Sequence, residues 1–200
     1  MQIKSIGVFC GSSIGAKEIY SQKAKELGEL MVAKKMDLIY GGGDVGLMGV
    51  IADAVLAKGG NAIGVIPTDL LNKEVGHSSL TKMHVTDNMS DRKNLINKLS
   101  DAFIAMPGGF GTLDEVMEVL TYFQLGFSNK PVAFLNVDGF YDPIITLFDN
   151  ILAEKFMKAE HRNNVIFESE PEALLKAIND FEAQKVDSKW ITDLKDKNTY

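Results

Sequence analysis

The residues best suited to chemistry lie in the stretch P-G-G-F-G-T-L-D-E, residues 107–115. It combines three glycines, a threonine and two adjacent acids. Glycine lets a backbone approach a ligand closely, and the free N–H groups at a helix start bind anions. We therefore expect a phosphate loop here, formed by Pro107, Gly108, Gly109, Gly111 and Thr112.

The same stretch also matches a capping box, with Thr112 as the helix N-cap and Glu115 at the third helical position. A cap accounts for these two residues but leaves the glycines unexplained. The two interpretations are compatible, because a helix start that holds Glu115 rigidly would also position its carboxylate for catalysis. The pure cap stays open as the alternative.

A second candidate group is M-S-D-R-K, residues 89–93, at the start of an expected helix. At helical spacing Met89, Arg92 and Lys93 share one face. A cation there would bind a phosphate or the substrate, and the alternative is a solvated helix face. In the same helix we expect Met89, Leu95, Ile96 and Leu99 to point inward.

Short apolar runs alternate along the chain with longer amphipathic ones. Strands are expected at 3–10, 37–40, 61–67, 83–86, 102–106, 131–137 and 165–169, and helices at 17–35, 47–59, 89–100, 113–126, 142–156 and 171–183, with a polar loop at 68–82. The strands are apolar without alternation, which is typical of a parallel sheet buried on both faces. The sequence therefore predicts an α/β fold with a doubly wound, mostly parallel sheet of about seven strands and helices on both faces.

We expect a single domain over residues 1–184, followed by a polar tail at 185–200. The tail contains Trp190, Ile191 and Leu194, which would either dock it or leave it frayed.

Ligands bind open parallel sheets beyond the carboxyl ends of the strands. Four loops follow strands at that edge, at 10–13, 41–49, 87–93 and 107–112. Besides the phosphate loop, this adds Gly11, Ser12, Gly42 and Gly43 to the candidate binding residues. Together the loops predict an anion site, of which a phosphate is the most plausible occupant.

Several other enzyme classes are not supported, because the sequence lacks residues that their motifs require. G-G-G-D-V-G (41–46) matches a dinucleotide motif, but it follows the second strand and no acid clearly ends the next one, since Asp69 lies past Pro67. The lysine of an ATP-binding loop and the G-x-S-x-G of an α/β-hydrolase are both absent from the sequence. The histidines His77, His84 and His161 have no metal-ligand spacing, so we expect no metal.

The bulk composition agrees with a small-molecule protein. The 200 residues carry a net charge of −6, which argues against a nucleic-acid or membrane surface. The single cysteine, Cys10, is expected to be a buried, inert thiol and fits a reducing compartment. We find no signal peptide and no apolar run near the roughly 20 residues of a membrane span, so we expect a cytoplasmic protein.

The motifs P-G-G-F-G-T-L-D-E (107–115) and G-G-G-D-V-G-L-M-G (41–49), with C-G-S-S (10–13) and D-R-K (91–93) in order, resemble those of the LOG (Lonely Guy) family. The likeness covers residues 3–180. Family members are cytokinin riboside 5′-monophosphate phosphoribohydrolases, often mislabelled lysine decarboxylases. The resemblance implies a Rossmann-like fold, at least a homodimer, and hydrolysis of the N-glycosidic bond of an adenine-type nucleoside 5′-monophosphate, AMP included, without a cofactor.

By motif match, the resemblance implies that Arg92 and Glu115 are the catalytic pair, with Asp114 a bystander. It places Met89, Lys93, Glu74 and Thr121 at the substrate site. Many members have histidine at the position of Ser90, so base specificity is left open.

The expected chemistry fits these residues. Breaking a ribosyl bond develops positive charge on the sugar. A carboxylate such as Glu115 can stabilise this charge or activate the water molecule that attacks the sugar. Arg92 stays charged, so its role is electrostatic. A decarboxylase would need pyridoxal phosphate on a Schiff-base lysine, which the motifs do not indicate. The alternative function is a non-catalytic carrier of a nucleotide or of molybdenum cofactor, to which an extra carboxylate would bring nothing.

Overall fold

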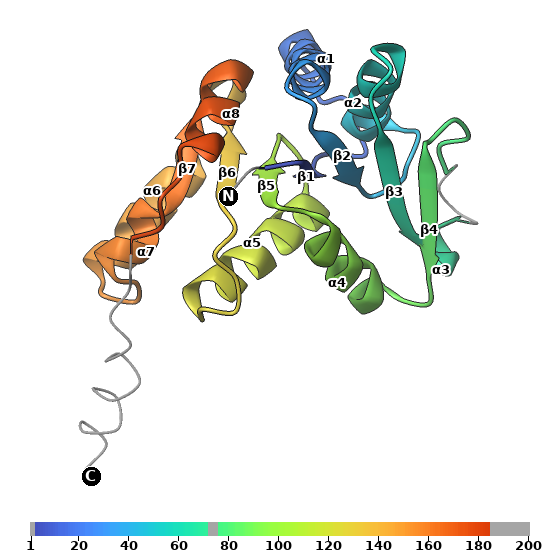
Figure 1. Ribbon diagram of the computed structural model, residues 1–200. Coiled ribbons are helices and arrows are strands. Elements are labelled where there is room, and N and C mark those ends of the chain that lie inside the picture. The colour runs from blue at the N-terminus through green and yellow to red at the C-terminus, as the bar shows by residue number, and fades with distance from the viewer. Residues whose placement is uncertain (1–2, 72–75, 185–200) are drawn as a thin grey trace.

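Seven parallel strands form one sheet in the order β4-β3-β2-β1-β5-β6-β7 (Figure 1). The computed structural model describes residues 3–71 and 76–184. The strands are β1 (Ser5–Phe9), β2 (Asp37–Tyr40), β3 (Ala62–Pro67), β4 (Lys82–Thr86), β5 (Ala102–Ala105), β6 (Val132–Leu135) and β7 (Val165–Glu168). The predicted parallel sheet of about seven strands is confirmed.

The helices are α1 (Glu18–Ala33), α2 (Gly46–Ala57), α3 (Thr68–Leu71), α4 (Met89–Leu99), α5 (Phe110–Gln124), α6 (Asp142–Ala153), α7 (Ala159–Asn163) and α8 (Pro171–Asn179), with a short 3-10 helix η1 (Val137–Gly139). The sequence patterns missed α3, α7 and η1, which have three to five residues each. Elements this short bury too little of any face to produce a periodic pattern.

Helices cover both faces of the sheet, as the doubly wound fold requires. One apolar cluster joins the sheet to α1, α2 and α8, and a second joins it to α4, α5 and α6. Strand β5 serves both clusters, because Phe103 and Ala105 face one side and Ile104 the other. This two-sided burial explains why the strands lack a polar alternation.

The chain reverses direction across the sheet at β1. Strands β2, β3 and β4 follow on one side of β1, whereas β5, β6 and β7 lie on the other (Figure 1). The loops after β1 and β5 therefore flank the switch point at which such folds bind ligands. The amide of Gly11 donates to the carbonyl of Pro107 at 3.0 Å, and the amide of Leu47 donates to the carbonyl of Gly11 at 3.0 Å.

Within residues 3–71 and 76–184, every helix is too short or too polar to cross a membrane.

Candidate active site

Two helices on one face of the sheet bring Arg92 and Glu115 together. Arg92 lies in the first half of α4 and Glu115 in the first half of α5. Nη1 of Arg92 lies 3.1 Å from Oε1 of Glu115, and the two side chains are only 11% and 10% exposed. Yet Oε1 has no hydrogen-bond partner in the part of the chain that the structure describes, so the guanidinium approaches it off-axis. The carboxylate therefore keeps the capacity to accept a further hydrogen bond.

Arg92 is held by the carboxyl ends of two strands. Its Nε–H donates to the carbonyl of Val65 in β3 at 3.1 Å. Its guanidinium also lies directly on Gly41, after β2, where an added Cβ would stand 2.3 Å from Nη2. Gly41 was not among the predicted site residues, although it opens the G-G-G run. The fold thus uses a glycine to admit the cation.

Burial raises the pKa of Glu115 above its usual range. The charge of Arg92 opposes this rise, Asp114 adds to it, Lys93 opposes it and Glu118 adds to it, each with a smaller effect than burial. A carboxyl group with a raised pKa can exchange a proton nearer to neutral pH than an ordinary one.

The expected phosphate loop lines a cleft of about 300 Å³ at the switch point. Gly11, Ser12, Pro107, Gly108 and Gly109 all belong to its wall, together with Ser13, Ile14, Gly15, Tyr20, Leu47 and Phe140. The structure therefore brings five of the predicted binding residues together around one opening.

The glycines of this loop differ in what requires them. A Cβ at Gly108 would stand 2.1 Å from Oγ1 of Thr112 and 2.9 Å from the amide nitrogen of Gly11, so close packing requires glycine there. A Cβ at Gly109 or Gly111 would meet no atom of the described residues within 4 Å, and neither residue has a positive φ. Neither packing nor backbone conformation within the chain requires glycine at these two positions.

The helix after the loop starts earlier than predicted, and the capping box is wrong. The N-cap of α5 is Gly109, and its first residue is Phe110 rather than 113. Thr112 is therefore the third helical residue, and no side chain caps this end. The extended backbone of Gly109, with φ −96° and ψ −154°, leads directly into the helix. The glycines themselves form the helix start, where backbone N–H groups are free to bind an anion.

The other glycine loop packs against a neighbouring segment. Gly42 has a φ of +79°, and its carbonyl accepts from the amide of His77 at 3.0 Å. Gly43 forms an isolated antiparallel bridge with Gly76. A Cβ at Gly46 would stand 2.2 Å from the carbonyl carbon of Ser12, so this loop also packs directly on the loop after β1.

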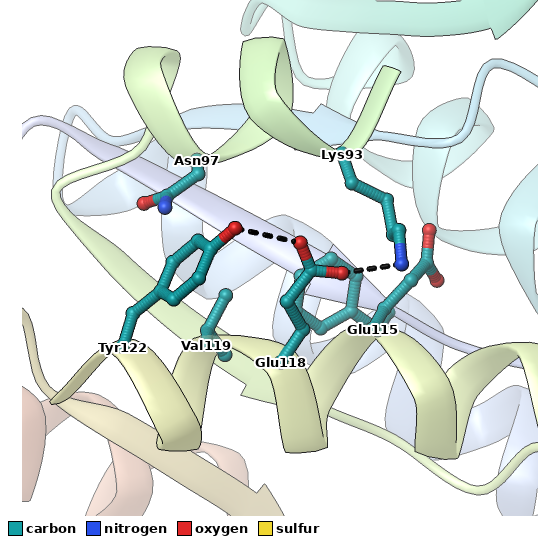
Figure 2. Close-up of a pocket in the computed structure, with 7 residues that line it drawn as sticks. Lys93, Asn97, Glu115, Glu118, Val119 and Tyr122 are labelled. Atoms are coloured by element: carbon teal, nitrogen blue, oxygen red, sulfur yellow. Dashed lines mark hydrogen bonds and ion pairs between the residues drawn. The ribbon is translucent and has the colours of Figure 1, made fainter. Parts of the chain in front are cut away.

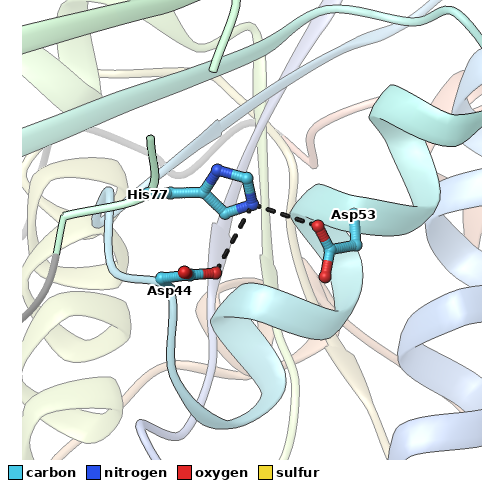
Figure 3. A group of neighbouring side chains, drawn as sticks. All are labelled: Asp44, Asp53 and His77. Carbon is cyan, nitrogen blue, oxygen red and sulfur yellow. Dashed lines mark hydrogen bonds and ion pairs between the residues drawn. The ribbon is translucent and has the colours of Figure 1, made fainter. Parts of the chain in front are cut away.

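His77 binds two aspartates beside that loop (Figure 3). Its Nε2 lies 3.1 Å from Oδ1 of Asp53 and 3.6 Å from Oδ1 of Asp44, a grouping of metal-ligand types that sequence spacing did not reveal. However, its Nδ1 accepts from the amide of Ser79 at 3.2 Å. The neutral ring then carries its hydrogen on Nε2, which donates to the carboxylates and has no lone pair for a metal. The group therefore ties the glycine loop to α2.

The remaining predicted residues lie in three different places. Met89 is exposed, not inward as expected, and its sulfur lies 3.9 Å from Nη1 of Arg92. Lys93 points toward α5, where it pairs with acids. Thr121 lies further along α5. Its hydroxyl donates to the carbonyl of Met117 at 2.8 Å, and it borders both an apolar groove and the surface that contains Glu118 and Tyr122. Glu74 lies outside the described residues.

Two further residues, Glu118 and Tyr122, belong to this site and were not predicted. They line a small pocket with Lys93, Asn97 and Glu115 (Figure 2). The available signal was helical spacing, since 115, 118 and 122 follow one another at three and four residues.

Known relatives match most of the chain. The family model described as "Possible lysine decarboxylase" matches residues 48–178. A rice protein (Oryza sativa subsp. japonica) named "Probable cytokinin riboside 5'-monophosphate phosphoribohydrolase LOGL9" is 46% identical over 172 residues, which cover 86% of this chain and 75% of the relative. The "Cytokinin riboside 5'-monophosphate phosphoribohydrolase LOG1" of Arabidopsis thaliana is 42% identical over 180 residues, covering 90% and 84%.

Solved structures share the fold. The molybdenum cofactor binding protein from the phototrophic bacterium Rippkaea orientalis superposes with a TM-score of 0.66 at 27% identity, covering 89% of this chain and 96% of that one. The relatives' names agree with the resemblance seen in the motifs, and the family model covers more than half of the sequence. This chain belongs to the LOG family of cytokinin riboside 5′-monophosphate phosphoribohydrolases.

Proposed function

We propose that this protein hydrolyses the N-glycosidic bond of an adenine-type nucleoside 5′-monophosphate to the free base and ribose 5-phosphate. The observation that carries the proposal is the buried ion pair of Arg92 and Glu115, in which Oε1 of Glu115 accepts no hydrogen bond from residues 3–71 and 76–184. The open space at Gly109 and Gly111 supports a phosphate at the start of α5, because the chain itself needs no glycine there. The names of the relatives support the same reaction.

The reaction follows from these positions. The phosphate binds the free N–H groups at the start of α5 and fixes the ribose. As the bond from C1′ to the base breaks, its electron pair leaves with the base and positive charge develops on the sugar, which the Glu115 carboxylate stabilises. Water adds through its oxygen to C1′ and gives up one proton to Glu115. Glu115 then releases this proton, which the departing base takes up, so the carboxylate is restored. Arg92 balances the charge of the departing base.

Decarboxylation, which the family description names, needs a neutral lysine to form a Schiff base. Lys93 is paired with Asp114 and Glu118, and hydrogen bonding to Glu118 raises its pKa. Such a lysine stays protonated and is a poor nucleophile. Lys93, the lysine beside Glu115, is therefore poorly suited to form a Schiff base, which favours hydrolysis at this site.

The second candidate function is a carrier without turnover. It is supported by the likeness to the molybdenum cofactor binding protein of Rippkaea orientalis. The buried carboxylate of Glu115 counts against it, because a carrier without turnover gains nothing from burying such a group beside its ligand. The identity of the base is left open by Ser90, which stands where many family members have histidine. Ser90 is exposed next to Met89 at the start of α4.

Incubation with AMP and with isopentenyladenosine monophosphate, followed by chromatography for free base, tests the proposal. We expect base from at least one substrate, and Glu115→Gln should bind the nucleotide without releasing base. Glu172→Gln, which changes an exposed glutamate on α8, is the matched control and should keep the wild-type rate. Binding without any release of base by the wild type would favour the carrier.

We also propose a cytoplasmic homodimer. An apolar groove between α5, α6 and α7 supports the dimer, because Phe156 at its edge is 77% exposed. Thr121 lines this groove and would face the partner subunit. The lone, buried Cys10 supports a reducing compartment.

A further inference from the structure

A second ion pair lies beside Arg92 and Glu115, one turn further along α5. Nζ of Lys93 contacts Oε2 of Glu118 and lies 3.3 Å from Oδ2 of Asp114. Figure 2 shows Lys93 reaching from α4 to the carboxylate of Glu118, with the Glu115 carboxylate beside its amine. Adjacent cations on α4 thus face acids one turn apart on α5.

Glu118 is held from both sides. The hydroxyl of Tyr122 donates to its Oε1 at 3.0 Å, while Lys93 contacts Oε2 (Figure 2). The side chains of Lys93 and Glu118 are each 23% exposed, whereas that of Asp114 is 60% exposed. Water screens the charge of Asp114 more than that of Glu118, so Glu118 is the stronger anchor for Lys93.

The cluster holds one more acid than base. Arg92 and Lys93 supply two positive charges against the three carboxylates of Asp114, Glu115 and Glu118. The other titratable groups facing Glu115 are neutral: Tyr122 is a phenol, and burial raises the pKa of the Cys10 thiol well above its usual range. One carboxylate is therefore left without a full cation, and Glu115, being the most buried, is the one that gains most from taking a proton.

We propose that Glu118 is a positioning residue: held by Tyr122, it keeps Lys93 away from Glu115, so that Glu115 can take up and release a proton. Without Glu118, Lys93 would turn to Glu115 and hold it as a carboxylate. Without Lys93, the neighbouring acids would push Glu115 further toward its protonated form. Removing either partner of one ion pair therefore has opposite effects on the same carboxyl group.

The test is a titration of Glu115 in the free protein by NMR with carbon-13 in the glutamate carboxyl groups, the signal being assigned with Glu115→Gln. We expect Glu118→Gln to lower the pKa of Glu115 and Lys93→Met to raise it, each by about one pH unit. Shifts in the same direction, or no shift in either variant, would overturn the inference. Should Glu118→Gln fail to fold, Tyr122→Phe decides, because it removes the hydroxyl that holds Glu118 without changing a charge; we expect it too to lower the pKa of Glu115, and an unchanged pKa would overturn the inference.

Asp114→Asn is the matched control. It also removes one acid next to Lys93, but from an exposed position. Through its charge alone, Asp114 raises the pKa of Glu115 more than Glu118 does. A clearly smaller shift than with Glu118→Gln therefore requires that Lys93 moves when Glu118 is lost, and this is what we expect. An equal shift would mean that net charge alone acts and that Glu118 positions nothing, which would contradict the proposal.

The catalytic consequence rests on the proposed function, but the titration does not. Where the hydrolase is active, the acid limb of its kcat/KM profile should move with the pKa measured for Glu115 in each variant. The expected NMR shifts in a protein that releases no base would overturn the function and leave the coupling intact. Release of base together with an unchanged pKa of Glu115 in the variants would leave the proposed function intact and overturn the coupling.

Discussion

At the scale of single residues, the site depends on a carboxyl group that is neither exposed nor fully paired. Glu115 has a cation at 3.1 Å, yet its near oxygen has no hydrogen-bond partner among the described residues. An aligned ion pair would have lowered its pKa, whereas here burial prevails and raises it. Burying the carboxylate of Glu115 costs stability, but it also gives this group the raised pKa that proton transfer can use.

The raised pKa predicts an acid limb in the pH profile. The carboxylate is the active form, so kcat/KM should fall as the pH drops through the pKa of Glu115, with a midpoint above the ordinary value of 4.5. Initial rates from acid to neutral pH measure this midpoint. A midpoint at or below the ordinary value would contradict the role given to burial.

Arg92 should be needed for turnover rather than for folding. Arg92→Ala removes the charge that balances the leaving base, and we expect kcat to fall by about 10²- to 10³-fold. Arg162→Ala is the control, since it breaks a 2.7 Å ion pair with Asp149 far along the chain and should keep its activity. Equal rates in Arg92→Ala and the wild type would mean that Arg92 has no part in the reaction.

At the scale of elements, the start of α5 separates two uses of glycine. Gly108 is required by the packing of Thr112 and Gly11, whereas Gly109 and Gly111 face open space. The loops after β1, β2 and β5 interlock through close contacts such as that between Gly46 and Ser12. The interlocked loops therefore hold Gly108 in place, while Gly109 and Gly111 beside it stay accessible to a ligand.

This separation predicts opposite outcomes for three substitutions to alanine. Gly108→Ala should lose about 1–3 kcal/mol of unfolding free energy through overpacking. Gly109→Ala and Gly111→Ala should keep wild-type stability but raise KM, because the new methyl groups stand where the phosphate binds. Urea unfolding and substrate titration measure the two effects. An unchanged KM in both Gly109→Ala and Gly111→Ala would mean that the phosphate does not bind at this loop.

At the scale of the whole molecule, the sheet order and the exposed apolar surface carry the argument. The reversal at β1 brings loops from residues 10–15 and 107–109 into one cleft. On a different surface, the groove lined by Met117, Phe123 and Phe156 leaves apolar side chains open to water. That surface is the one we assign to a second copy of the chain.

Light scattering should therefore give twice the mass of the 200-residue chain. Phe156→Glu should shift the mass toward the monomer, because it places a charge in the groove. Val85→Glu, at another exposed apolar position on the edge strand β4, is the control and should remain dimeric. A monomeric wild type would end the dimer proposal.

The sequence by itself determined the parallel sheet, the order of its strands and longer helices along the chain, and the loops that carry the candidate site, because apolar runs and glycine clusters are local properties of the chain. It also indicated Arg92 and Glu115. Only the tertiary structure decided that α5 begins at Phe110, that Gly41 makes room for Arg92, and that Lys93 belongs to Glu118. The last two depend on contacts between residues far apart in the chain, which no local spacing encodes, and the first depends on the backbone conformation of Gly109.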